Sequence, residues 1–174
     1  MRITLLSDTH GTLPADGYAR HLDWADEIWH AGDFGPLVAD ALDAFGKPVR
    51  GVWGNIDEAP LRHRHPKINA FEAGGAAVWM THIGGYPGRY APGIRAALLA
   101  AAQAAPRPSS SPVLFICGHS HILKVMPDPA LGVLHLNPGA AGRYGFHVVR
   151  TLLRFQLNDG RISDLQAVEL GKRA

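Results

Sequence analysis

The sequence predicts a single-domain α/β fold. In the first third of the chain, short apolar runs alternate with segments of helical spacing, the order typical of parallel β-α-β units. Later runs are joined by short glycine-containing turns, which indicates hairpins. A length of 174 residues suits one hydrophobic core, and 47% hydrophobic with 18% charged residues is typical of a globular protein. We therefore expect one domain over residues 1–174.

The first half is predicted to run strand, helix, strand, helix, strand. Each strand is a short apolar run that ends in polar or glycine residues. Pro36 is expected in the first turn of the second helix, where its missing N–H is tolerated, and Gly46 follows the end of that helix. The strands are expected at residues 2–6, 27–31 and 48–54, and the helices at residues 14–25 and 36–45.

The second half is predicted to be mostly antiparallel. Two strand-like runs in residues 68–82 meet around Gly74 and Gly75, which indicates a hairpin, and an Ala/Leu-rich helix is expected at residues 94–105. Residues 106–112 are a low-complexity stretch and are interpreted as a surface loop. Further strands are expected at residues 113–117, 123–126, 133–136, 148–157 and 161–168, the last two forming a hairpin.

Composition and charge argue against several functions. Seventeen Lys and Arg against fifteen Asp and Glu leave a formal net charge of +2, which disfavours binding to long nucleic acid. No apolar run approaches the length of a membrane span, and the first residues turn polar too soon for a signal peptide. Cys117 is the single cysteine, which excludes an intrachain disulfide and fits a reducing compartment. We therefore expect a cytoplasmic protein that does not bind membranes.

Polar side chains follow five of the predicted strands at the point where each strand ends. All are oxygen or imidazole-nitrogen donors, and most have a neighbouring glycine that allows a sharp turn. In open α/β sheets, ligands bind at the carboxyl ends of the strands, so these residues are expected to converge on one rim. They are Asp8, His10, Asp33, Asn55, His82, His119 and His121.

This donor set suits a pair of divalent metal ions. Carboxylate, carboxamide and imidazole ligands are typical of Mn, Fe, Zn, Co and Ni sites, and the lack of thiolates argues against a structural zinc site of the cysteine type. Two ions about 3.5–4 Å apart lower the pKa of a bridging water and bind phosphoryl oxygens. Each motif alone is weak: for His82 by itself, a structural role is the better prediction by about three to one. The ordered set carries the prediction.

The motifs resemble those of the calcineurin-like metallophosphoesterase superfamily. They occur in the expected order as SDTHG, HAGDF, WGNID, MTH and CGHSH, followed by NPGA near Asn137. Within the superfamily, the chain resembles the smallest members, the YfcE-like phosphodiesterases and the related scaffold subunit of retromer. The resemblance covers about residues 3–139. It implies the metallophosphoesterase fold, two mixed β-sheets packed as a sandwich flanked by helices.

The resemblance also implies a ligand set and a reaction. One metal would be held by Asp8, His10, Asp33 and His121. The second would be held by Asp33, Asn55, His82 and His119, with Asp33 bridging. The implied reaction is attack of a metal-bridging hydroxide on a small phosphodiester. Mn is the first expectation for the two divalent ions, with Ni, Fe, Co and Zn as alternatives.

Two positions depart from the family pattern. In many members a histidine follows the asparagine of the third motif and is thought to protonate the leaving group or bind the phosphate, whereas here the residue is Ile56. Without that acid, activity should favour esters that have good leaving groups, such as aryl diesters. YfcE-like members lack the same histidine, so catalysis is still expected. The second departure is that Ile83 and Gly84 follow His82, where relatives often have Gly-His.

Two functions stay open. A metal-dependent phosphodiesterase is favoured because all seven ligand positions are filled, and a phosphomonoesterase is less favoured because Ile56 has no proton to donate. The alternative is a metal-binding scaffold for protein–protein interaction, of the retromer-subunit type, with little or no catalysis. Asp33, Asn55 and Arg89 are the candidate catalytic residues. Arg89 is included because it lies in a glycine-rich segment, residues 84–90, and can bind phosphate bidentately.

The other polar residues are interpreted mainly as structural. Asp57 could orient a ligand or cap the next turn, and the structural role is favoured, whereas His30 is expected to lie behind the ligands or in the core and Cys117 to be a small buried hydrophobe. The basic run at residues 61–67 is either the mouth of the site or a solvated loop. Residues 142–146 are a candidate surface for a homodimer or higher oligomer. The histidines expected to be purely structural are His21, His135 and His147.

Overall fold

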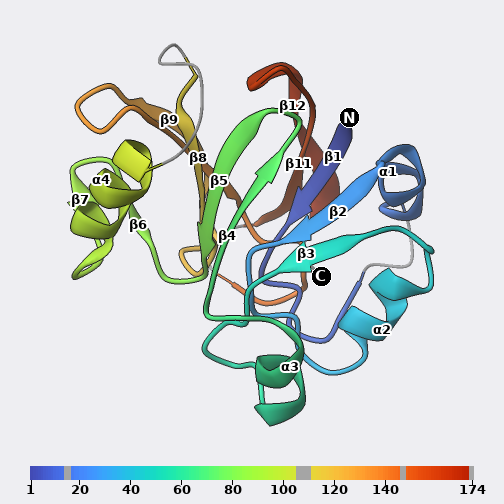
Figure 1. Cartoon of the computed structure of the whole chain (residues 1–174). Helices are drawn as coiled ribbons and strands as arrows, with labels where there is room; N and C mark the ends of the chain where they lie inside the picture. The colour runs from blue at the N-terminus through green and yellow to red at the C-terminus, as the bar shows by residue number, and fades with distance from the viewer. Residues whose placement is uncertain (14–16, 105–110, 146–147, 173–174) are drawn as a thin grey trace.

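The computed structural model is built around two β-sheets of five strands each, which pack face to face (Figure 1). It describes residues 1–13, 17–104, 111–145 and 148–172. The layer between the sheets is apolar: Leu5 and Phe155 of the first sheet share one cluster with Met80 and Ile116 of the second, and none is exposed. Burial of each such side chain contributes about 1.5–3 kcal/mol, so this layer holds the sheets together. The predicted sandwich of two mixed sheets is confirmed.

The first sheet carries the predicted β-α-β units. In spatial order it contains β12 (Arg161–Lys172), β11 (Val149–Asn158), β1 (Arg2–Leu6), β2 (Glu27–His30) and β3 (Val49–Gly51). β1, β2 and β3 are parallel, whereas β11 pairs antiparallel with both β1 and β12. The carboxyl ends of the three parallel strands therefore lie at one edge of the sheet, where ligand sites form in this class of fold.

Two short helices connect the parallel strands and contribute to an apolar cluster on one face of this sheet. α1 (Ala19–Trp24) and α2 (Val38–Asp43) are both shorter than predicted. The helix expected from Pro36 begins two residues later because Leu37 has a left-handed φ of 67°, which a right-handed helix cannot contain. The predicted start of the first helix, at residues 14–16, lies outside the described residues. No helix in the described part of the chain is long and apolar enough to cross a lipid bilayer.

The second sheet differs from its prediction at the centre. In spatial order it contains β4 (Ile68–Ala73), β5 (Ala76–Thr81), β8 (Val113–Ile116), β10 (Val133–Pro138) and β9 (Leu123–Asp128). The β4–β5 hairpin is confirmed, and most strand pairs in the second half are antiparallel as predicted, but β5, β8 and β10 run parallel at the centre of this sheet. Between β5 and β8 the chain passes through α4 (Ile94–Ala104), a crossover that lets β8 start at the same end as β5. Most of the predicted loop, residues 105–110, lies outside the described residues.

Two small elements also differ from the prediction. The basic run at residues 61–67 is partly helical, because α3 spans Ala59–Arg64. Its signal in the sequence is Pro60, which lies in the first turn, where proline is favoured. The glycine-rich segment at residues 84–90 forms a short hairpin of β6 (Gly85–Tyr86) and β7 (Arg89–Tyr90).

Candidate metal centre

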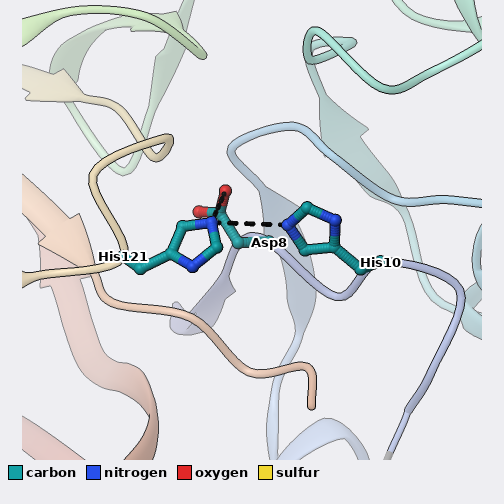
Figure 2. Close-up of side chains that lie close together, drawn as sticks. All are labelled: Asp8, His10 and His121. Atoms are coloured by element: carbon teal, nitrogen blue, oxygen red, sulfur yellow. Dashed lines mark hydrogen bonds and ion pairs between the residues drawn. The ribbon is translucent and has the colours of Figure 1, made fainter. Parts of the chain in front are cut away.

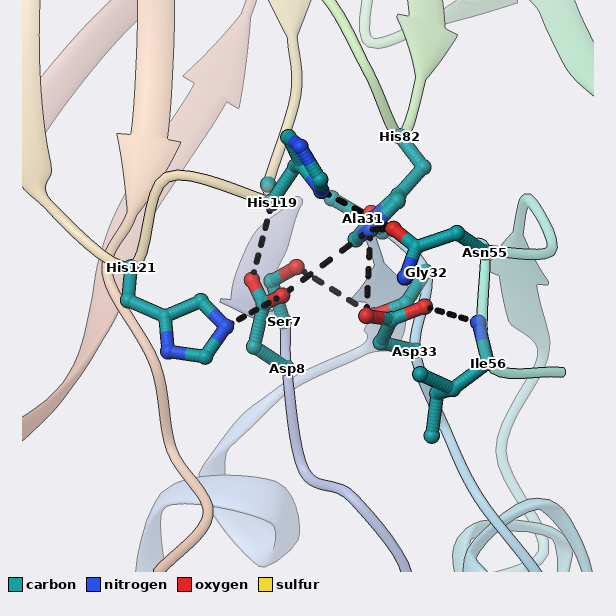
Figure 3. A network of polar contacts seen from close by, with 12 residues as sticks. Ser7, Asp8, Ala31, Gly32, Asp33, Asn55, Ile56, His82, His119 and His121 are labelled. Atoms are coloured by element: carbon teal, nitrogen blue, oxygen red, sulfur yellow. Dashed lines mark hydrogen bonds and ion pairs between the residues drawn. The ribbon is translucent and has the colours of Figure 1, made fainter. Parts of the chain in front are cut away.

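The seven donors predicted from the sequence lie together where the carboxyl ends of strands from both sheets meet. Figure 3 shows this convergence for the donors other than His10, and Figure 2 shows His10 with its two neighbours. The loops after β1, β2 and β3 bring donors from the first sheet, and those after β5 and β8 bring donors from the second. In chain order they are Asp8 and His10 after β1, Asp33 after β2, Asn55 after β3, His82 after β5, and His119 and His121 after β8.

The first group of donors consists of Asp8, His10 and His121 (Figure 2). The Nε2 atoms of His10 and His121 lie 3.3 Å apart, and His121 Nε2 lies 3.1 Å from Asp8 Oδ1. Asp8 Oδ1 is buried and accepts no hydrogen bond. A buried carboxylate oxygen without a donor is costly, so this oxygen and the two ring nitrogens are best satisfied by a cation.

The second group contains Asp33, Asn55, His82 and His119 (Figure 3). His82 Nε2 lies 3.2 Å from Asp33 Oδ2 and 3.1 Å from Asn55 Oδ1. The same Asn55 oxygen lies 2.9 Å from His119 Nδ1. A further contact joins this group to the first, because the backbone N–H of His119 donates to Asp8 Oδ2 at 3.1 Å. The two groups therefore form one continuous network.

The tautomer of His82 is fixed from outside the network. Its Nδ1–H donates to the backbone carbonyl of Ala31 at 2.8 Å, because a carbonyl can only accept. In the neutral ring the Nε2 lone pair therefore faces the oxygens of Asp33 and Asn55. Lone pairs on three facing atoms repel one another unless a proton or a metal ion lies among them. A backbone carbonyl that holds the remote ring nitrogen in this way is typical of histidines that bind metals.

Burial and neighbouring charges move the pKa values of these groups in opposite directions. Partial burial of the ring lowers the pKa of both His10 and His119, which keeps the two rings neutral and able to coordinate. Burial alone would raise the pKa of Asp33, but its hydrogen bond with His82 lowers it below the ordinary value. Burial alone would lower the pKa of His82, but the hydrogen bond with Asp33 and the charges of both carboxylates raise it. Without metal, His82 thus tends to carry a proton where a metal ion could replace it.

Five of the seven donors have a left-handed backbone. Only three other non-glycine residues in the described part of the chain share a positive φ. For residues with a side chain this conformation costs about 1–2 kcal/mol, and such strain gathers at functional sites. The five donors, with φ between 47° and 65°, are Asp8, His10, Asp33, His119 and His121.

Three glycines that each directly precede a donor allow the loops to pack closely. A Cβ atom at Gly32 would overlap the ring of His82, and one at Gly54 would overlap the carboxylate of Asp33. A Cβ at Gly118 would overlap the hydroxyl of Ser7. The glycines of the second, third and fifth motifs are therefore needed because no side chain fits between the loops.

Asp57 holds two of the donor loops against each other. Its carboxylate accepts hydrogen bonds from the backbone N–H groups of Phe34, Gly35 and Gly54, at 3.2, 2.9 and 2.8 Å. The first two belong to the loop after β2 and the third to the loop after β3. This confirms the structural role predicted for Asp57, because its oxygens face backbone donors.

His30 and Thr9 form a second support beneath the donors. The N–H of Gly32 donates to His30 Nδ1 at 3.2 Å, so His30 Nε2 carries the proton and donates to the Thr9 hydroxyl at 3.0 Å. The Thr9 hydroxyl in turn donates to the carbonyl of Phe34 at 2.9 Å. His30 is fully buried, as expected. The role of Thr9 was missed, although its place between the first two donors is the signal that could have found it.

Arg89 is not brought to the network. It lies on β7 and lines a separate cavity with Asp128 and Leu131. Asp128 is paired with Val133 at the end of the second sheet where β8 begins, whereas His119 follows the opposite end of β8. The catalytic role of Arg89 therefore stays a prediction without a contact to support it.

The basic run at residues 61–67 is largely engaged in structural contacts. Arg64 forms ion pairs with Asp40 and Asp43 of α2. The Arg62 guanidinium lies 4.6 Å from the centre of the Trp53 ring, and its Nε donates to the backbone carbonyl of Asp57. Lys67 lines a cavity together with Asn55 and His82. Phe146 and His147, which the sequence singled out, lie outside the described residues.

A scan against family models finds one match, the calcineurin-like phosphoesterase superfamily domain, over residues 1–160. The chain belongs to this superfamily. The match includes all seven donors and every strand except β12, so the resemblance inferred from the short motifs is confirmed. The calcineurin-like phosphoesterases use divalent metals, and the present chain supplies candidate ligand groups for them. No curated protein matches the chain.

Solved structures show the same calcineurin-like phosphoesterase fold at low sequence identity. A single-residue variant of Vps29 from Entamoeba histolytica has a TM-score of 0.68 and 19% identity, and the match covers 98% of this chain and 100% of that one. Protein TM1076 from Thermotoga maritima has a TM-score of 0.67 and 24% identity, with 97% and 99% covered. The phosphoesterase YfcE from E. coli has a TM-score of 0.59 and 19% identity, with 97% and 100% covered.

Proposed function

We propose that this chain is a phosphodiesterase that holds two divalent transition-metal ions, with Mn²⁺ as the first candidate. The observation that carries the proposal is the pair of buried carboxylates, Asp8 and Asp33. Within the described residues, both contact imidazoles but neither pairs with a lysine or an arginine. Buried charges need partners of opposite sign, and a proton on His82 supplies only one positive charge for the two carboxylates. Two divalent ions, when bound, balance this charge, supply a hydroxide nucleophile at neutral pH and neutralise charge on phosphoryl oxygens.

The chain divides the two metal positions between its donors. Asp8, His10 and His121 would hold one ion, and Asn55, His82 and His119 the other. Asp33 can serve both, because the backbone N–H of Ile56 donates to its Oδ1 at 3.0 Å and leaves Oδ2 facing the imidazoles. Asp33 Oδ2 lies 3.8 Å from His10 Nε2 and 3.2 Å from His82 Nε2. The fixed loops orient these atoms before any substrate arrives.

The residues beside the donors favour diesters over monoesters. Ile56, directly after Asn55, has no proton to give to a departing alcohol, so the alcohol must leave as an anion. Aryl alcohols satisfy this condition because their anions are stable. A monoester brings a second negative charge on the phosphate, and no described lysine or arginine makes a contact with the network that would balance it. We therefore expect phosphodiesters with good leaving groups to react fastest.

A metal-binding scaffold is the second candidate, and one observation favours it. Leu37 is 79% exposed and Ile56 is 41% exposed, and both line a cavity beside the network. Exposed apolar side chains that gather in one place often mark protein interfaces. Vps29 of Entamoeba histolytica has been solved in complex with Zn²⁺, so a metal is compatible with this fold in that relative.

The deciding experiment is hydrolysis of bis(p-nitrophenyl) phosphate by protein that is stripped of metal and refilled with Mn²⁺. We expect turnover that requires the metal, is lost in Asn55→Ala, and exceeds turnover of p-nitrophenyl phosphate. Metal content measured on the same samples separates the two candidates. Two bound ions without turnover would reject the phosphodiesterase and favour the scaffold.

A further inference from the structure

A cavity of about 490 Å³ opens beside the metal donors Asn55 and His82. The loop after β3 forms one wall of it, the ends of β4 and β5 form a second, and the start of α4 closes the third. Away from the two donors its lining is mostly apolar, with Trp53, Ile68, Trp79 and Ile83 as the largest side chains. This combination of an apolar cavity with a few polar groups at one end is typical of sites that bind small organic molecules.

Two isoleucines at the mouth of this cavity are unusually exposed. Ile68 and Ile83 each keep 46% of their surface exposed, although Ile68 is paired with Thr81 directly before the donor His82. Single exposed apolar residues need no explanation, but here two lie in one cavity beside the donors. Covering either side chain with an apolar ligand group would remove apolar surface from water and so favour binding.

The charge at the rim of the cavity is positive. Lys67 lines the cavity, and its Nζ lies 5.9 Å from the centre of the Trp53 ring. The guanidinium of Arg62 lies over the same ring at 4.6 Å. The ring that could otherwise attract a cationic ligand is therefore already covered by cations. A ligand group with its own positive charge would be repelled at this rim.

We propose that this cavity binds one alcohol group of the phosphodiester and selects groups that are apolar, ring-bearing and without positive charge. The inference rests on the proposed function, because it places the phosphoryl group at the metal donors. The size is sufficient, since a cavity of about 150 Å³ already binds benzene in another protein. The preference also agrees with Ile56, because aryl alcohols are the leaving groups that need no acid.

A neighbouring cavity is the main competitor for this role. It has a volume of about 250 Å³ and is lined by Leu37, Ile56 and Leu61 among others, but by none of the seven donors. A group bound there would be separated from the network by the Asn55–Ile56 turn. The cavity that includes Asn55 and His82 in its own wall is therefore the better candidate.

The test measures binding rather than turnover. Phenylphosphonate and methylphosphonate each carry one organic group, so their affinities for the Mn²⁺-filled protein compare a ring with a methyl group directly. By titration calorimetry we expect phenylphosphonate to bind about tenfold more tightly than methylphosphonate. Ile68→Ser and Ile83→Ser should each remove most of this preference. Leu99→Ser, at an α4 position of similar exposure, 40%, should leave it unchanged.

Charge is tested with 2-aminoethylphosphonate. We expect it to bind no more tightly than methylphosphonate to the native protein, and to gain several-fold in Lys67→Glu. Equal binding of the phenyl and methyl compounds, or binding of neither, would overturn the inference. Loss of the preference in Leu37→Ser instead of Ile83→Ser would place the ring in the neighbouring cavity and also overturn it. A lack of diester hydrolysis with the ring preference intact would reject only the proposed function.

Discussion

The left-handed backbone of His119 gives a prediction whose sign can be checked. His119 has a φ of 65° and an exposed side chain, so its replacement leaves the core intact. Relief of left-handed strain is worth about 1–2 kcal/mol, and the larger entropy of glycine in the unfolded chain offsets about 0.5–1 kcal/mol of it. We therefore expect metal-free His119→Gly to be about 1 kcal/mol more stable than His119→Ala. Both variants remove the same imidazole contacts, so only the backbone differs between them.

Denaturant unfolding followed by circular dichroism in the presence of EDTA measures this difference. In a domain of this size, 1 kcal/mol corresponds to about 2–4 °C in Tm, so thermal melts give a second reading. His63 provides a matched control, because it is an exposed histidine inside α3 with a helical backbone. There the order should reverse, with Gly about 0.5–1 kcal/mol less stable than Ala.

The result that would refute this reasoning is an alanine variant at position 119 that is as stable as the glycine variant. The loop would then not be strained, and the donor conformation would need another explanation. In both His119 variants, Mn²⁺ should raise Tm less than in the native protein, because one donor is missing.

Three further predictions follow from other parts of the molecule. Asp8→Asn should raise the stability of the metal-free protein, because it removes one of two buried carboxylates, and should abolish the rise in Tm on adding Mn²⁺; a lower metal-free Tm would contradict this. Burial raises the pKa of the Cys117 thiol to about 12, so iodoacetamide at pH 8 should modify it only after unfolding, as mass spectrometry can show. Burial lowers the pKa of His135 to about 4, so the unfolded chain takes up a proton as the pH falls below 6.5 while the folded protein does not. The native protein should therefore lose up to about 3 kcal/mol more stability than His135→Leu between pH 7 and pH 4, and parallel pH profiles from urea melts would rule this out.

The donor positions were predictable because each follows a recognisable apolar strand. Asp8, Asp33 and His82 all come directly after runs whose length and composition mark them as strands, and parallel strands bring their carboxyl ends to one edge. The position of each donor therefore depends on local sequence plus one general rule of topology. The supporting contacts are harder to predict, because Asp57 reaches backbone donors in two loops that only the fold brings together.

The features that the sequence did not reveal depend on distant contacts. α3 is only one and a half turns long, too short to be stable alone, and Arg64 ties it to Asp40 and Asp43 of α2. No local pattern reveals those pairs. Arg89 looked suited to a lid, but the neighbouring Tyr90 hydroxyl donates to Asp128 at 2.6 Å and holds this segment at the far end of the second sheet. The parallel direction of β8 likewise depends on where α4 returns the chain.

The glycines before Asp33, Asn55 and His119 have a consequence for how members of this superfamily are sorted. They offer no side-chain atom to a metal ion, yet they make up much of what is recognisable in the motifs. A Cβ at any of them would collide with another loop. A descendant chain that exchanged a donor for an inert residue would still need these glycines to fold. Such a pseudoenzyme would keep a convincing signature after losing its chemistry. To distinguish catalytic members from inactive ones, the residue at each donor position must therefore be compared separately. The glycines beside the donors should not count as evidence of catalysis.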